Sequence, residues 1–125
     1  MKGIRMQGGI PLQGKVRIQG SKNAALPILA ATLLTNEVSY IQNCPRIADV
    51  HRFVHLLREL GCLVHWQEKG IRVQPGGRDD LPCERAEARR RRGEAITGMR
   101  SSLCLLGALL GKCGYVTMEH PGGCV

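Results

Sequence analysis

Apolar positions recur at helical spacing in the segment IADVHRFVHLLRELG, residues 47–61. They fall on one side of a helix with 3.6 residues per turn, so the segment predicts an amphipathic helix. Asp49 is a candidate cap at its start. Gly61 predicts its end, because glycine readily adopts the left-handed backbone that closes many helices. The apolar positions are Ile47, Val50, Phe53, Val54, Leu57 and Leu60.

Two other segments, residues 22–34 and 97–110, consist largely of alanine, leucine and other small residues. Such composition predicts helices that are mostly buried. Ser21 is available as the N-cap of the first helix. Pro27 must lie near the first turn of that helix or bend it, because proline lacks the backbone N–H that interior positions donate.

Alternation of polar and apolar residues predicts the strands. Residues 4–7 and 15–19 alternate around the turn-forming GGIPLQG, which predicts a strand pair. The segments CLVHW and IRVQ flank QEKG and predict a hairpin. Short strands are expected at residues 38–41 and 115–119. By contrast, residues 75–93 have no apolar period and include four consecutive arginines, so they predict a loop that is either solvated or poorly ordered.

The second aliphatic helix repeats the first at a distance of 77 positions. This echo predicts a repeated strand-and-helix unit. Lys22 and Arg100 would then stand at the starts of two equivalent helices, where unpaired N–H groups and the helix dipole favour anions. The matching pairs are Leu26 and Leu103, Leu29 and Leu106, Ala31 and Ala108, and Leu33 and Leu110.

Charge and cysteine content limit the class of protein. The 125 residues carry a net charge of +8, which favours phosphate-bearing partners. Aromatic residues make up only 3%, so the core should be aliphatic. There are six cysteines but no CxxC pair, and the first residues lack the apolar region of a signal peptide. We therefore expect a cytoplasmic protein with reduced thiols, no metal site and no membrane span.

Four short segments could carry chemistry: SKNAALP, GMRSS, PGGC and RRRR. Each also has an ordinary interpretation. Lys22, Asn23 and Arg100 could be solvated residues at helix starts. Cys124 could be a small buried side chain. The arginine run could be a solvated stretch or a nucleic-acid contact, and it comprises Arg89, Arg90, Arg91 and Arg92.

Together, GSKNAALPILAATLL, GMRSSLCLLGALL and PGGC resemble the first part of the UDP-N-acetylglucosamine 1-carboxyvinyltransferases, a family of bacterial enolpyruvyl transferases. The resemblance implies part of an inverse α/β barrel built from repeated strand-and-helix units, with substrates in a cleft between two domains. Residues 1–21 would join the other domain. Residues 22–125 would form the first unit and the start of the second, so the C-terminal portion of the enzyme would be missing.

The resemblance also implies an activity without metal or organic cofactor. The enolpyruvyl group of phosphoenolpyruvate moves to the 3'-hydroxyl of UDP-N-acetylglucosamine and phosphate leaves, in peptidoglycan precursor synthesis. By position, Lys22 would bind phosphoenolpyruvate, Asn23 would contact substrate and Arg100 would neutralise phosphate. Cys124 would donate a proton, which suits a thiol with an ordinary pKa of about 8.5.

Two other functions remain open. One is another enolpyruvyl transferase, such as the shikimate-pathway enzyme, in which the PGGC cysteine is not expected. The other is a basic module that binds nucleic acid through the arginine run, although the shortage of aromatic residues for base stacking argues against it. The segment CERAEARRRRG is longer and more basic than the family pattern, and no function is assigned to it. The chain alone is expected to bind substrate weakly and to turn nothing over.

Overall fold

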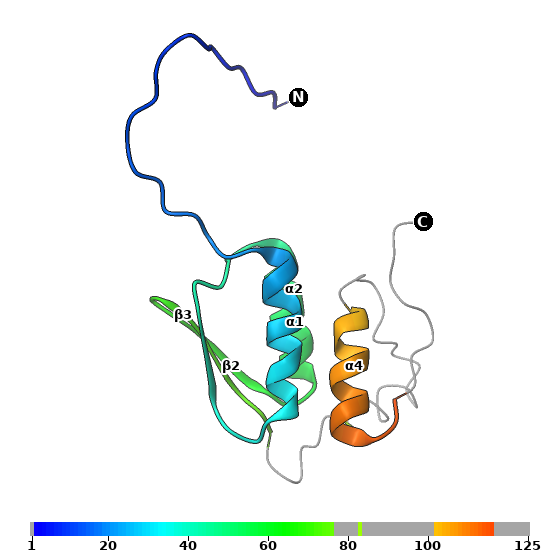
Figure 1. Ribbon diagram of the computed structural model, residues 1–125. Coiled ribbons are helices and arrows are strands. Elements are labelled where there is room, and N and C mark those ends of the chain that lie inside the picture. Colours follow the sequence, from blue (N-terminus) through cyan, green and yellow to red (C-terminus); the bar gives the residue numbers. More distant parts are fainter. Residues whose placement is uncertain (1, 77–82, 84–101, 117–125) are drawn as a thin grey trace.

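The computed structural model describes residues 2–76, 83 and 102–116, which form helices packed on one side of a small sheet (Figure 1). The sheet is three-stranded and antiparallel, in the order β1-β3-β2. This mixed α/β architecture agrees with the predicted class. The elements are α1 (Lys22–Ala31), the 3-10 helix η1 (Thr32–Leu34), β1 (Ser39–Gln42), α2 (Ala48–Glu59), β2 (Leu63–Gln67), β3 (Gly70–Gln74) and α4 (Ser102–Cys113).

Helix α2 confirms the amphipathic pattern, because the side chains at its predicted apolar positions Val50, Phe53 and Leu57 are fully buried. Gly61 ends the helix as predicted, with a φ of 92°. Its N–H donates to the Arg58 carbonyl at 2.9 Å, and the N–H of Cys62 donates to the Leu57 carbonyl at 3.0 Å. These two bonds form a Schellman motif, which turns the chain directly into β2.

Helix α1 begins at Lys22, as predicted, but its cap differs from the expected one. Ser21 is the N-cap residue, yet its side chain makes no capping hydrogen bond. The Ser21 carbonyl accepts the first intrahelical bond, from the N–H of Ala25 at 2.9 Å. Pro27 lies in the second turn, where its missing N–H leaves the Asn23 carbonyl without the usual donor four residues on.

The predicted hairpin is confirmed. Strands β2 and β3 pair antiparallel from Gln67 opposite Gly70, with a two-residue connection, Glu68 and Lys69. A Cβ atom on Gly70 would lie 2.1 Å from the carbonyl oxygen of Ile41, so only glycine lets β1 approach β3 at this register. Strand β1 itself begins one residue later than expected, at Ser39.

One largely aliphatic core, which also contains Phe53, joins the sheet to the helices, and α4 reaches it through Leu105, Ala108 and Leu109. These residues show that the predicted 77-residue echo is out of register. It matches the buried Leu26 and Leu33 with Leu103 and Leu110, which are 46% and 51% exposed. The buried positions of the two helices instead correspond at a distance of 79: Leu26 with Leu105, Leu29 with Ala108 and Ala30 with Leu109. In that register Lys22 corresponds to Ser101, and Arg100 corresponds to Ser21.

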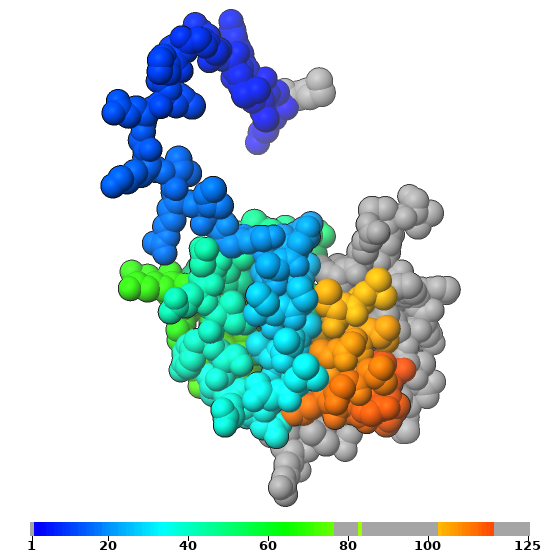
Figure 2. Space-filling model, in the orientation of Figure 1, coloured from blue at the N-terminus to red at the C-terminus, as the bar shows by residue number. Residues whose placement is uncertain are grey.

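The predicted strand pair before α1 is wrong. Residues 4–7 and 15–19 form no strand, and the chain before α1 extends away from the body (Figures 1 and 2). Alternation makes a segment able to pair, but a strand also needs a partner, and the part of the chain that the structure describes offers none here. The assignment of residues 1–21 to another domain remains a prediction.

Several predictions fall partly outside the described residues. The loop predicted at 75–93 is described only at residues 75, 76 and 83, and the helix predicted at 97–110 only from Ser102. That helix continues to Cys113, beyond its predicted end. Tyr115 and Val116 are not in a strand, and the remainder of the strand predicted at 115–119 is not described.

Within the described ranges, no helix has the length and apolar character needed to cross a membrane.

Candidate functional site

The predicted substrate-binding residues Lys22 and Asn23 are the first two residues of α1, and both are exposed. The other two predicted site residues, Arg100 and Cys124, lie outside the described residues. The roles predicted for Arg100 in neutralising phosphate and for Cys124 in donating a proton therefore stay predictions. The structure describes the part of the predicted site at the start of α1, around Lys22 and Asn23.

Lys22 is held by a carboxylate from the next helix. Its Nζ donates to Oδ2 of Asp49 at 2.9 Å, and Nη1 of Arg52 lies 3.8 Å from the other carboxylate oxygen of Asp49. The predicted capping role of Asp49 is wrong, since Ile47 is the N-cap residue of α2 and makes no side-chain capping hydrogen bond. Asp49 instead joins the starts of two helices.

The electrostatics of this group leave a net positive charge. The hydrogen bond from Lys22 and the charge of its ammonium group hold the pKa of Asp49 below its ordinary value, against an opposing effect of burial, and Arg52 adds the smallest lowering effect. Asp49 is therefore ionised at neutral pH, and two cations surround one anion. An ammonium group has three N–H donors, and one of them is directed at Asp49, so two remain for a ligand.

The backbone at the start of α1 adds further donors. The amides of Lys22, Asn23 and Ala24 precede the first intrahelical bond, which Ala25 donates, and the Ser21 side chain does not cap them. Such amides, together with the positive end of the helix dipole, favour an anion. The site can therefore bind a phosphate or carboxylate group between the backbone and the Lys22 side chain.

The chain is fixed immediately before this site. The N–H of Gly20 donates to the Asn43 carbonyl at 3.2 Å, and a Cβ atom on Gly20 would lie 2.2 Å from that oxygen. Asn43 has a φ of 54° and donates its own N–H to the Lys69 carbonyl at 3.0 Å. The entry to α1 is thus connected through Asn43 to the turn of the hairpin.

A basic cavity of about 360 Å³ lies between the segment before α1, the loop after β1 and the hairpin turn. No local sequence pattern predicted this cavity, because its lining residues come from three separate segments. Arg46 is held in place there, with its guanidinium 4.8 Å from the centre of the Trp66 ring and its Nη2 donating to the Gln67 carbonyl at 2.7 Å. Burial raises the pKa of the Cys44 thiol, against the opposing charge of Arg46. The lining residues are Arg17, Gln19, Asn43, Cys44, Arg46, Glu68, Lys69 and Gly70.

Comparison with known proteins finds relatives that share one name. Similar proteins named UDP-N-acetylglucosamine 1-carboxyvinyltransferase occur in Methylacidiphilum infernorum, at 38% identity over 125 residues, and in Sorangium cellulosum, at 43% over 126 residues. A protein of the same name in Coprothermobacter proteolyticus is 42% identical over 124 residues. The alignments cover 99 to 100% of this chain but only 27 to 28% of each relative.

The chain therefore spans little more than a quarter of the length of the relatives that it matches. Residues 6–124 also match the family described as EPSP synthase (3-phosphoshikimate 1-carboxyvinyltransferase). This match covers nearly the whole chain and includes the start of α1, where the described site lies. The chain belongs to the EPSP synthase family of enolpyruvyl transferases.

Proposed function

We propose that this chain supplies part of the active site of an enzyme that transfers the enolpyruvyl group of phosphoenolpyruvate to the 3'-hydroxyl of UDP-N-acetylglucosamine. The observation that carries the proposal is Lys22 at the start of α1, where its ammonium group is held by Asp49 beside backbone amides that have no acceptor among the described residues. This arrangement suits the phosphate or carboxylate of phosphoenolpyruvate. Asn23, the next residue, would contact the same substrate.

The names of the relatives favour UDP-N-acetylglucosamine as the acceptor over shikimate 3-phosphate. The PGGC segment supports the same choice, since a cysteine at position 124 would act as the acid of the reaction. Its thiol would protonate the methylene carbon of phosphoenolpyruvate, while the sugar hydroxyl adds to the neighbouring carbon and gives its proton to a base. Phosphate would then leave together with one proton of the new methyl group, which restores the carbon–carbon double bond. Arg100 would neutralise substrate phosphate during these steps.

The complete reaction belongs to the longer relatives, and we propose that this chain alone binds phosphoenolpyruvate weakly without turnover. A second domain would supply the opposite wall of the cleft. Excluding water from both substrates requires that wall. Phosphate release from phosphoenolpyruvate with UDP-N-acetylglucosamine should therefore stay at background.

Calorimetric titration of the chain with phosphoenolpyruvate tests the proposal. Lys22→Ala should weaken binding roughly tenfold, the effect of losing one charge-assisted hydrogen bond. Lys15→Ala is the matched control, since it removes the same charge from the exposed segment before α1, and it should bind as the parent chain does. Equal affinities for the Lys22→Ala variant and the parent chain would rule out the assignment of Lys22.

The acceptor is tested separately by titrating UDP-N-acetylglucosamine and shikimate 3-phosphate, each in the presence of phosphoenolpyruvate. Tighter binding of UDP-N-acetylglucosamine supports the proposal. Tighter binding of shikimate 3-phosphate would assign the chain to the shikimate-pathway enzymes instead.

A further inference from the structure

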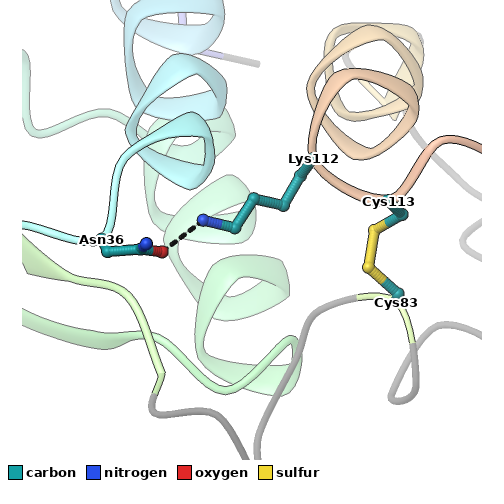
Figure 3. Close-up of a disulfide and its surroundings, with 4 residues drawn as sticks. All are labelled: Asn36, Cys83, Lys112 and Cys113. Carbon is teal, nitrogen blue, oxygen red and sulfur yellow. Dashed lines mark hydrogen bonds between the residues drawn. A yellow bond between two sulfur atoms is a disulfide. The ribbon is translucent and has the colours of Figure 1, made fainter.

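Cys83 and Cys113 form a disulfide, which contradicts the expectation that all thiols are reduced (Figure 3). Their Cα atoms are 5.7 Å apart, within the roughly 4.4–6.8 Å that disulfides span. The bond joins the chain beyond β3 to the last residue of α4, across 30 positions of sequence. Both residues are half-buried, so a small reagent can reach the bond.

The apolar side chains of helix α4 do little to fix the rotation of the helix about its own axis. Its sequence, SLCLLGALLGKC, has leucine on several faces. Leu105 and Leu109 are buried, whereas Leu103 and Leu110 are about half exposed. Turning the helix by one or two residues would exchange one leucine pair for the other at little cost in apolar burial. The mistaken register of the sequence echo reflects the same ambiguity.

Specific contacts at the C-terminal end of α4 distinguish the observed register. Lys112 donates from Nζ to the Oδ1 of Asn36 on one side, while Cys113 reaches Cys83 on another (Figure 3). Gly111 faces η1, where an added Cβ atom would lie 3.0 Å from a methyl carbon of Leu34. Of these contacts only the disulfide is covalent, and only it responds to the redox state of the solution.

We propose that Cys83 and Cys113 are a reversible thiol–disulfide site whose oxidation locks α4 in this rotational register. The oxidant is a low-molecular-weight disulfide such as oxidised glutathione. One cysteine thiolate attacks it, forms a mixed disulfide and releases one small thiol. The second cysteine then displaces the other small thiol. Two protein thiols thus become one disulfide, and two electrons and two protons end on two molecules of glutathione. This inference does not depend on the proposed enzymatic function.

The first experiment identifies the bond in the full chain after incubation with oxidised glutathione. Peptide mapping under non-reducing conditions should recover Cys83 linked to Cys113, and dithiothreitol should release it. Its absence from the map of the parent chain would overturn the proposal, whatever the behaviour of the variants.

The second experiment compares thermal unfolding with and without dithiothreitol. The reductant should lower the melting temperature of the oxidised parent chain by at least about 5 °C, because the cross-link restricts a long loop of the unfolded chain. Cys83→Ser and Cys113→Ser should be insensitive to the reductant. Cys104→Ser is the matched control on the same helix, and it should keep the full response. A response retained in Cys83→Ser, or lost in Cys104→Ser, would contradict the pairing.

The third experiment tests the register itself. Cys104 is half-buried on α4 and packs against the core, so its rate of alkylation by iodoacetamide reports rotation of the helix. Cys104 should react several-fold faster in Cys83→Ser than in the oxidised parent chain. An unchanged rate would show that the disulfide does not set the register.

Discussion

The Nζ atom of Lys22 lies 2.9 Å from Oδ2 of Asp49, so the first residue of α1 is bound to the second residue of α2. The two helices therefore begin side by side. Asp49 gives the Lys22 side chain one orientation and reduces the positive charge that an incoming anion meets. Lys22 attracts the anion, whereas Asp49 orients the Lys22 side chain. Substitution of Asp49 can therefore separate the effect of orientation from the effect of charge.

Asp49→Asn should increase the affinity of the chain for phosphoenolpyruvate, by roughly threefold at low ionic strength. The amide keeps a hydrogen-bond acceptor for Lys22 but removes a negative charge beside the ligand. Calorimetric titration at two salt concentrations measures the change, and added salt should reduce it. Glu37→Gln, which removes an equal charge at an exposed position after η1, should leave the affinity unchanged. A fall in affinity for Asp49→Asn would show that orientation of Lys22 outweighs charge.

The carboxyl group of Asp49 should titrate below the ordinary aspartate range in the folded chain, because the Lys22 ammonium favours its ionised form. A pKa that is lower in the folded than in the unfolded state contributes stability above the unfolded value, about 3.9, and this contribution is lost as the pH falls through the folded value. Carbon-13 NMR of the carboxyl group measures the titration. Lys22→Ala should return the pKa toward its ordinary value, and an unmoved midpoint would contradict the contact.

Gly70→Ala should destabilise the chain by roughly 1–3 kcal/mol, the range typical of a backbone clash that forces two strands apart. The added Cβ atom would meet the Ile41 carbonyl at 2.1 Å. Urea denaturation followed by circular dichroism measures the change. Gly107→Ala provides the contrast, because that glycine is within α4 with no atom close to an added Cβ. Alanine there should stabilise by roughly 0.5–1 kcal/mol. Equal effects of the two substitutions would argue against the described β1–β3 register.

The sequence predicted correctly those helices and strands that are determined by residues close together in the chain. Helix α2 has both an apolar period and a closing glycine, and the hairpin has alternating strands on either side of a two-residue turn. The bond between Lys22 and Asp49 could not be predicted in the same way, because it joins residues 27 positions apart whose proximity depends on how two helices pack.

Helix α4 shows a different limit of the sequence. Its existence follows from composition, but its buried face does not, because leucines on several faces make different rotations nearly equivalent. The predicted strands before α1 failed for a third reason. The alternation of polar and apolar residues shows that a segment can form a strand. Whether the strand forms depends also on a second segment with which its backbone can hydrogen-bond. The basic cavity, assembled from three segments, had no local signal at all.

The extended chain before α1 has a practical consequence for handling the purified chain. Six large apolar side chains on this segment are between 70% and 98% exposed, and the backbone beside them has no strand partner among the described residues. Such a segment can form intermolecular β-pairs with its counterpart in another molecule. Solubility of the isolated chain should therefore depend on protein concentration, so binding measurements belong in dilute solution.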